Sequence, residues 1–358
     1  MTKTVFLGFV IAMLSILSCS SASENEETSI VLPSNLSITD VKDGVDQDNP
    51  NGNGSGIVHF TITADNASYY KVLINNETLE ITQSTFSYTF SQPGTNEYSI
   101  VAAAYNSSGN ISVTYAVTVY VDAELNLIWQ DEFDTNGTPD TSNWGYNTGT
   151  GDNGWGNNES QYYTDRLDNA KVEYGVLKIT AKKEDYQESA YTSARLLTAG
   201  KFEFTYGRVD VRAKLPAGGG VWPAIWMLGA NFGSVGWPAC GEIDIMEYVG
   251  NNPGQISSAL HTTSSSGATV NHKVTFITNE TTEFHLYSAI WTENSITFLL
   301  DDVEYYTYNP STKNDATWPF YNNQFIILNI AMGGNLGGTI DPNFDSSVME
   351  IDYVRVYQ

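Results

Sequence analysis

The segment GEIDIMEY, from Gly241 to Tyr248, places three carboxylates in an otherwise apolar stretch. Its aliphatic residues predict a buried strand. Side chains alternate between the two faces of a regular strand, so Glu242 and Asp244 would share one face and Glu247 would point to the other. That arrangement would drive an unpaired charge into an apolar core, which costs several kcal/mol. A regular strand is therefore the costly solution for this segment.

One extra residue near Ile245 and Met246, a β-bulge, would return Glu247 to the face of the other two acids, and we predict such a bulge. Two carboxylates on opposite sides of a scissile bond are what glycoside hydrolysis requires, with ~5 Å between them for retention and ~6.5–9.5 Å for inversion. We expect the shorter separation. Like charges this close cannot all ionise, so one stays protonated and can act as the acid. A calcium site and a solvated acidic strand are the alternative interpretations.

Aromatic residues precede the acidic strand in GGGVWPAIWML, from Gly218 to Leu228, and at Trp237. Together with GEIDIMEY, this motif strongly resembles glycoside hydrolase family 16, in particular its laminarinases, which are endo-β-1,3-glucanases. The resemblance runs from about Leu127 to Tyr357 through IWQDEFD, NNESQYYT, TSARLLT, YGRVDVRAKLP, SALH and MEIDYVRVY. The order of these separate matches makes the resemblance specific.

The resemblance implies a role for each acid of the strand. Glu242 would be the nucleophile, Glu247 the acid/base, and Asp244 the residue that positions and electrostatically tunes them. Hydrolysis would then proceed by double displacement with net retention. Substrate contacts are implied for a further set of residues: Asn158, Glu159, Arg195, Trp222, Trp226, Trp237 and His261. The three tryptophans are expected to wall the sugar subsites, because pyranose rings present apolar C–H faces.

The resemblance also implies one structural calcium ion on the face away from the cleft. The matching positions are Glu132, Gly175 and Asp352, whose oxygens are hard ligands suited to calcium. No cofactor is expected for catalysis.

Several other functions remain open. Within the same family, a mixed-linkage β-1,3-1,4-glucanase and an agar or carrageenan hydrolase are alternatives. Outside hydrolysis, the chain could be a transglycosylase or a glucan-binding lectin. The extra Met246, which gives Glu-x-Asp-x-x-Glu in place of Glu-x-Asp-x-Glu, resembles laminarinases and argues against a strict mixed-linkage enzyme.

The chain is strongly acidic, with 41 Asp and Glu against 16 Lys and Arg and a formal charge of −25. This balance argues against nucleic acid, whose phosphates need basic residues to neutralise them. It does not repel a neutral polysaccharide such as a β-glucan. We expect a monomer.

The 358 residues are long enough for two domains and a leader. Residues 1–19 read as a secretory signal, and the Ile-Leu-Ser-Cys sequence that ends at Cys19 resembles a bacterial lipoprotein cleavage site. A lipid on Cys19 would tether an exported protein to a membrane, as an outer-membrane or cell-surface lipoprotein. Residues 20–33 read as a flexible linker.

Two β domains are expected to follow the linker. Residues 34–122 contain five alternating segments, at 57–64, 69–75, 85–90, 97–106 and 111–121, which suggest a small immunoglobulin-like sandwich. This part looks like PKD-type modules, either as a spacer or as a sugar-binding module. Residues 124–358 show no helical periodicity and predict an all-β sandwich. The resemblance implies a β-jelly roll of the concanavalin-like type for this catalytic domain.

Overall fold

The computed structural model describes residues 31–47 and 49–358, and it is an all-β protein. Within those residues the α-helices are two four-residue segments, α1 (Phe232–Val235) and α2 (Gly334–Gly337), and η1 (Gly154–Asn158) is a single π-helical turn. None of the described helices has the length and apolar character to cross a membrane. The expected signal at 1–19, Cys19 and most of the 20–33 linker lie outside the described residues.

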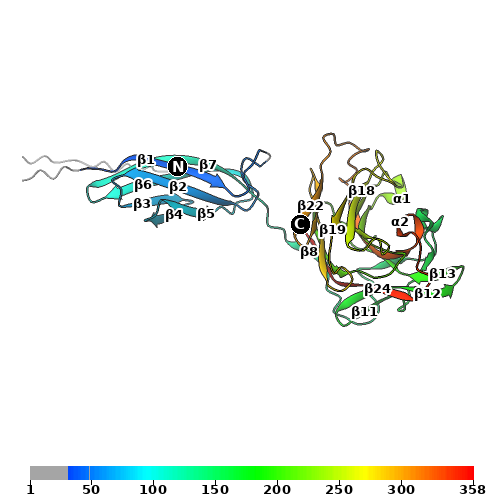
Figure 1. Ribbon diagram of the computed structural model, residues 1–358. Coiled ribbons are helices and arrows are strands. Elements are labelled where there is room, and N and C mark those ends of the chain that lie inside the picture. The colour runs from blue at the N-terminus through cyan, green and yellow to red at the C-terminus, as the bar shows by residue number, and fades with distance from the viewer. Residues whose placement is uncertain (1–30, 48) are drawn as a thin grey trace, which may run out of the picture. The chain divides into compact units, whose positions relative to one another are not determined.

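The chain divides into two compact units between Glu124 and Leu125. The first unit has a three-stranded sheet in the order β1-β2-β5 and a four-stranded sheet in the order β4-β3-β6-β7 (Figure 1). The strands are β1 (Ser34–Lys42), β2 (Ile57–Asp65), β3 (Tyr69–Ile74), β4 (Glu77–Ile81), β5 (Thr85–Thr89), β6 (Gly94–Asn106) and β7 (Gly109–Val121). Both sheets contribute side chains to one hydrophobic core, which includes Val58, Phe60, Val72 and Ile100.

The structure has strands at all five segments expected in this unit, and it adds β1 and β4. Each of the two extra strands buries few apolar residues, with Ile38 the buried residue of β1 and Ile81 that of β4. A strand that buries so little carries a weak hydrophobic pattern, which is why the sequence did not reveal it.

The second unit is a sandwich of a ten-stranded and a seven-stranded sheet, which confirms the all-β expectation. The ten-stranded sheet contains β8 (Leu127–Asp131), β10 (Gln161–Tyr163), β11 (Ala170–Glu173), β12 (Val176–Tyr186), β13 (Ser189–Ser193), β15 (Gly207–Lys214), β20 (His285–Trp291), β21 (Ile296–Leu300), β22 (Val303–Tyr308) and β24 (Ser346–Tyr357). The seven-stranded sheet has the order β19-β18-β17-β16-β23-β14-β9. Its strands are β9 (Gly145–Asn147), β14 (Arg195–Leu197), β16 (Val221–Gly229), β17 (Glu242–Tyr248), β18 (Gln255–His261), β19 (His272–Phe276) and β23 (Gln324–Met332).

The core of this unit lies between the two sheets. Val211 of the ten-stranded sheet and Ile225, Ile243 and Leu328 of the seven-stranded sheet belong to one buried cluster. Because strand side chains alternate, the residues between these aliphatic positions point away from the core. That outer face of the seven-stranded sheet carries the acids of β17, and we call it the active-site face.

Candidate active site

The predicted bulge is present in β17. Asp244 lies opposite Ala259 of β18 and Glu247 lies opposite Ser257, so three steps on β17 match two on β18. The pairing with β16 shifts at the same place, between the partners of Ile225 and Trp226. The extra residue brings Glu242, Asp244 and Glu247 to the active-site face, whereas Ile245 and Met246 are both buried in the core.

Two tryptophans donate hydrogen bonds to the outer acids of this row. The Nε1–H of Trp222, on β16, donates to Glu247 Oε1 at 3.0 Å. The Nε1–H of Trp237 donates to Glu242 Oε2, also at 3.0 Å. Each bond fixes one carboxylate oxygen, and the Trp237 side chain is still 45% exposed. The two indoles therefore orient the acids as well as offering a surface for a ligand.

His261 lies beside the first two acids, directly opposite Glu242 in the pairing of β17 with β18. Its Nε2 is 3.1 Å from Asp244 Oδ2 and 3.6 Å from Glu242 Oε1. Asp244 is 4% exposed, and its Oδ2 has no hydrogen bond in the described structure. The imidazole thus contacts the most buried part of the acidic row.

Arg195 opens β14, and its guanidinium lies between two indole rings. Its Cζ is 4.6 Å from the centre of the Trp155 ring and 4.7 Å from that of Trp226. The negative charges of Glu159 and Glu242 act on it. Its Nε is buried without a hydrogen-bond partner among the described residues. Stacking therefore fixes the plane of the guanidinium while leaving that donor unused.

The remaining predicted contacts, Asn158 and Glu159, lie at the turn η1 (Gly154–Asn158), which α2 contacts. Asn158 is exposed and donates to Asn335 Oδ1 at 2.8 Å. Glu159 Oε2 accepts from Gln161 Nε2 at 2.7 Å and from the Tyr163 hydroxyl at 3.2 Å. Both side chains are thus held by protein partners, and the charge of Glu159 acts on Arg195.

Sequence reasoning missed two residues of this site. Trp155 lies two residues before the matched NNES motif, and this proximity was the available sequence signal. Asn329, on β23, accepts from Trp226 Nε1 at 2.7 Å and donates to the Tyr163 hydroxyl at 3.1 Å. No sequence signal marked Asn329, because its partners come from strands far apart in the chain.

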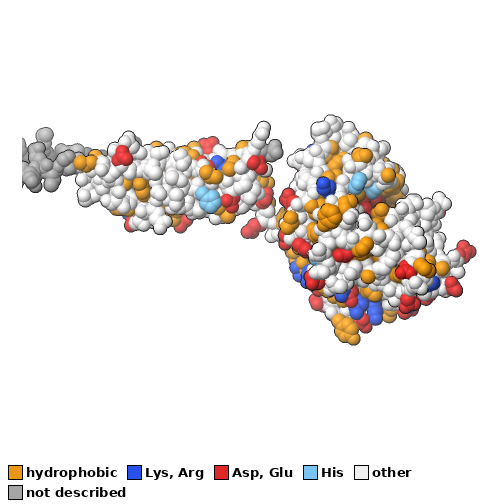
Figure 2. Space-filling model, in the orientation of Figure 1, with side chains coloured by type: hydrophobic (Ala, Val, Ile, Leu, Met, Phe, Trp, Pro, Cys, Tyr) orange, Lys and Arg blue, Asp and Glu red, His pale blue; other side chains and the backbone are white. Residues whose placement is uncertain are grey.

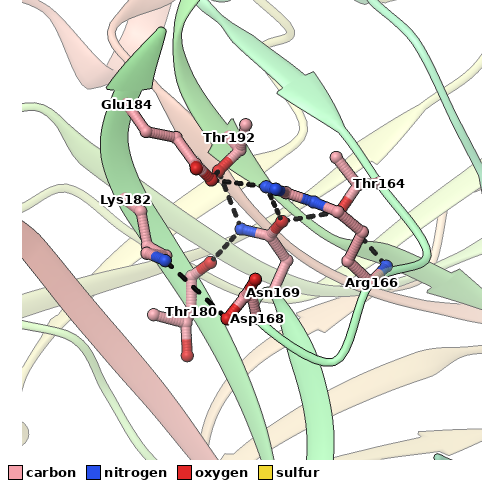
Figure 3. Close-up of polar contacts among 8 residues, drawn as sticks. All are labelled: Thr164, Arg166, Asp168, Asn169, Thr180, Lys182, Glu184 and Thr192. Atoms are coloured by element: carbon pink, nitrogen blue, oxygen red, sulfur yellow. Dashed lines mark hydrogen bonds and ion pairs between the residues drawn. The ribbon is translucent and has the colours of Figure 1, made fainter. Parts of the chain in front are cut away.

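A partly buried polar network holds the segments that lead to Arg195 (Figure 3). Asn169 Oδ1 accepts from the Thr164 hydroxyl at 2.6 Å and from Arg166 Nη2 at 2.9 Å. Its Nδ2 donates to Thr192 Oγ1 at 2.9 Å, three residues before Arg195. The other members of the network are Asp168, Thr180, Lys182 and Glu184. The buried part of this network, Asn169 with Thr164 and Thr192, fixes the end of β13 from which the chain enters β14 at Arg195.

Burial changes the protonation of all three acids. Burial, followed by the charge of Asp244, raises the pKa of Glu242 to about 8. Burial raises the pKa of Asp244 to about 8. Burial and the charge of Asp244 raise the pKa of Glu247 to about 8, although the hydrogen bond from Trp222 acts in the opposite direction and lowers this pKa. The acids titrate as a coupled set, so ionisation of one member keeps a proton on another near neutral pH.

These raised pKa values predict a pH-dependent stability. The folded chain keeps protons that the unfolded chain releases from about pH 4.5, so stability falls as the pH rises toward about 8. Glu242→Gln removes one of these acids, so its stability should fall less as the pH rises. We expect the Tm of the variant minus the Tm of the wild type to increase from pH 5 to pH 8. Scanning calorimetry across this range measures the difference, with the exposed Glu304→Gln as matched control. Parallel Tm curves for the wild type and Glu242→Gln would contradict the prediction.

The three positions expected to bind calcium lie in the ten-stranded sheet and its turns. Both carboxylate oxygens of Glu132 accept from Arg355, at 2.7 and 2.9 Å. Asp352 accepts from Arg212 Nη1 at 2.6 Å, and Gly175 occupies the turn between β11 and β12 with φ +76°. In the structure, Glu132 and Asp352 are thus each engaged by an arginine.

Comparison with known proteins identifies the scaffold of this site. The family model described as "Glycosyl hydrolases family 16" matches residues 155–355. The chain is 44% identical over 244 residues to a beta-glucanase from Rhodothermus marinus, a match that covers 65% of this chain and 85% of that protein. The structure of a laminarinase from Flavobacterium sp. UMI-01 is similar with a TM-score of 0.62 and 47% identity, covering 65% of this chain and 100% of that one.

A second solved structure, the laminarinase from Rhodothermus marinus, gives a TM-score of 0.62 and 43% identity, over 66% of this chain and 98% of that one. These matches fall on the unit that carries the bulged acidic strand. The jelly-roll expectation for this unit agrees with them. The chain belongs to glycosyl hydrolase family 16, and its second unit is a glycoside hydrolase of that family.

Proposed function

We propose that this enzyme is a retaining endo-β-1,3-glucanase that acts on laminarin-type β-glucans. The observation that carries the proposal is the bulge in β17, which aligns Glu242, Asp244 and Glu247 on one face. The likeness to two laminarinase structures, at 47% and 43% identity, supports the substrate. A binding protein without activity would not need three acids in one row, with Asp244 buried and both glutamates partly buried, and this argues against the lectin alternative.

In the first step, Glu247 donates its proton to the glycosidic oxygen while Glu242 attacks the anomeric carbon. The C–O bond to the leaving sugar breaks and an ester bond to Glu242 forms. The Trp237 N–H holds Glu242 Oε2 at 3.0 Å, which leaves Oε1 for the attack. The Trp222 N–H holds Glu247 Oε1, which leaves Oε2 to carry the proton.

In the second step, Glu247 is ionised and takes a proton from water, whose oxygen attacks the same anomeric carbon. The ester bond to Glu242 breaks, and the two inversions give net retention. Asp244 contributes its charge, which is among the causes of the raised pKa of both glutamates. Glu247 has already given its proton to the leaving sugar, and with Glu242 esterified and neutral the row carries one fewer acid that can ionise, so Glu247 can serve as base.

Sugar binding is assigned to the aromatic and polar residues around the row. The exposed part of Trp237 offers an apolar face to a pyranose ring. Arg195 lies between two indoles, and its guanidinium N–H groups are suitable donors to a sugar hydroxyl. His261 lies against Asp244 and Glu242, where it would meet the sugar at the cleavage site.

We expect Arg195→Met to weaken substrate binding more than turnover. Methionine keeps an unbranched apolar side chain between the indoles but removes every donor. A hydrogen bond to a charged group contributes about 1.5–3 kcal/mol, so kcat/KM for laminarin should fall about 10- to 100-fold, mainly through KM. Steady-state kinetics measure this, and Arg208→Met on β15 of the other sheet is the matched control. An unchanged KM would remove Arg195 from the substrate contacts.

The alternatives differ in their substrates and products. Reducing ends released from laminarin, mixed-linkage β-1,3-1,4-glucan, agarose and carrageenan, measured in parallel, test the substrate. Proton NMR of the first products tests retention, which requires the β-anomer to appear first. Product sizes after long incubation separate hydrolysis from transglycosylation. Activity on a galactan but not on laminarin would overturn the substrate and leave the mechanism standing.

We propose that the first unit is an immunoglobulin-like or PKD-type module that acts as a spacer. The order of its two antiparallel sheets, β1-β2-β5 and β4-β3-β6-β7, supports this kind of sandwich. Laminarin pull-down by residues 31–124 alone would favour sugar binding over a spacer.

Two expectations stay predictions. Lipidation of Cys19, and with it the membrane tether, is tested by mass spectrometry of the mature N-terminus. Calcium binding at Glu132 and Asp352 would raise the Tm in calcium over that in a chelator, and equal Tm values would contradict it.

A further inference from the structure

Exposed apolar side chains gather at the edge strand of the seven-stranded sheet. Val270, Val274 and Phe276 are 81%, 44% and 79% exposed. Strand β19 pairs with β18 and ends the sheet on that side. Single exposed hydrophobic residues are ordinary, but several within one short segment at an open sheet edge favour aggregation unless something binds them. This exposed apolar segment is therefore a candidate ligand-binding surface.

Strand register places two of these residues on the active-site face. Glu247 lies opposite Ser257, and Ser257 lies opposite Val274, so these three side chains share a face. Phe276 lies opposite Gln255, two residues from Ser257, and therefore has the same orientation. Two strand spacings, or about 10 Å, separate the backbones of β17 and β19. Val274 thus extends the row of Glu247 to the sheet edge.

The burial of neighbouring residues gives an independent check of this orientation. Ile277, the next residue after Phe276, is buried in the core cluster between the sheets. Adjacent strand residues point to opposite faces, so the Phe276 ring points away from the core. Phe276 makes no ring contact within the described residues, in contrast to most aromatic residues of this unit. One face of its ring is therefore available to a ligand.

His272 lies on the same face of β19 as Val274 and Phe276, at the end nearer to Asp244 in the strand register. It lies opposite Ala259, which lies opposite Asp244. Its charge also acts on Glu247. Figure 2 shows hydrophobic side chains at the surface over β18 and β19, beside histidine side chains. The strip of His272, Val274 and Phe276 is thus continuous with the acidic row.

We propose that Val274 and Phe276 form an additional sugar subsite at the β19 end of the active-site face, with the Phe276 ring packed against a pyranose. This inference rests on the proposed glucanase function. A glucan chain that is bound across the strands over Glu247 and extends toward the sheet edge reaches this strip. The C–H face of a sugar complements an exposed aromatic ring. A second copy of the protein fits less well, because the net charge of −25 opposes self-association.

The test uses the full chain with Phe276→Ala, and Val303→Ala as control. Val303 is 67% exposed on β22, in the other sheet. KM and kcat are measured on laminarin and on β-1,3-gluco-oligosaccharides from three to seven units. We expect Phe276→Ala to raise KM for laminarin about three- to tenfold, with kcat and Tm unchanged. The rise should appear only above a threshold chain length, whereas Val303→Ala should resemble the wild type at every length.

Several results would overturn the subsite. An unchanged KM for laminarin in Phe276→Ala, or an equal rise for the trisaccharide and for laminarin, would remove Phe276 from chain binding. Sedimentation at assay concentration tests whether a second copy of the protein binds the strip instead. A wild type that is dimeric and a Phe276→Ala variant that is monomeric would assign the strip to that second copy. A wild type inactive on all β-1,3-glucans would overturn the proposed function and the subsite together, whereas an active wild type with an unaffected variant overturns the subsite alone.

Discussion

Glu242→Gln is expected to reduce laminarin hydrolysis on the order of 10⁴-fold or more, because an amide cannot attack the anomeric carbon or leave as a carboxylate. The side chain is 17% exposed and keeps its place beside Trp237, so substrate can still bind. Folding should be intact, since the change removes one of three mutually repelling buried acids. The loss should therefore appear in kcat, with a Tm no lower than that of the wild type.

The matched control for this variant is Glu350→Gln on β24. Glu350 pairs with Lys214 at 2.7 Å in the other sheet and does not contact the active-site face. Its replacement should leave kcat unchanged. Wild-type activity in Glu242→Gln would end the assignment of the nucleophile.

Glu247→Gln should lower laminarin hydrolysis about 10²- to 10⁴-fold, the usual contribution of general acid–base catalysis. The glutamine keeps the side-chain oxygen that accepts from Trp222 but has no proton to give to the leaving sugar. A dinitrophenyl β-laminaribioside removes this need, because its phenolate leaves without protonation. On that substrate the first step should stay fast, and hydrolysis of the ester on Glu242 should become limiting.

Added azide distinguishes the acid/base from a structural residue. Azide is an anionic nucleophile that needs no base, so it should attack the glycosyl-enzyme of Glu247→Gln and release the β-glycosyl azide. The rate should rise with azide concentration, and NMR identifies the anomer. An absence of rescue, or the same β-azide formed by Glu242→Gln, would mean that the two roles are wrongly assigned.

The bulge in β17 was predictable because both the pattern and its energetic penalty lie in one short segment. The alternation of Ile243 with the acids sets the faces, and the cost of burying Glu247 requires one extra residue. The register confirms this prediction. The contacts of the acids were less accessible to sequence. The tryptophans were expected as walls for sugar rings, but in the structure the N–H groups of Trp222 and Trp237 also bind the carboxylates.

The predicted calcium positions have partners that the sequence did not indicate. Glu132 and Asp352 are residues of a suitable type, but each is paired with an arginine from a neighbouring strand. An ion pair across a sheet depends on the register of strands that are distant in sequence, so a local motif cannot report it. Arg195 is a similar case, since its stacking partners Trp155 and Trp226 come from separate segments.

The amino-acid sequence alone determined that this chain is all-β, that three acids share one face of a bulged strand, and that the second unit resembles glycoside hydrolase family 16. Period-2 alternation and the cost of buried charge are local properties, and they can be read over a few residues. Only the tertiary structure decided which side chains meet across strands. It brought Arg195 between two indoles, Asn329 between Trp226 and Tyr163, and the exposed Phe276 onto the face of Glu247. These contacts depend on sheet order and register, which arise when distant segments pair.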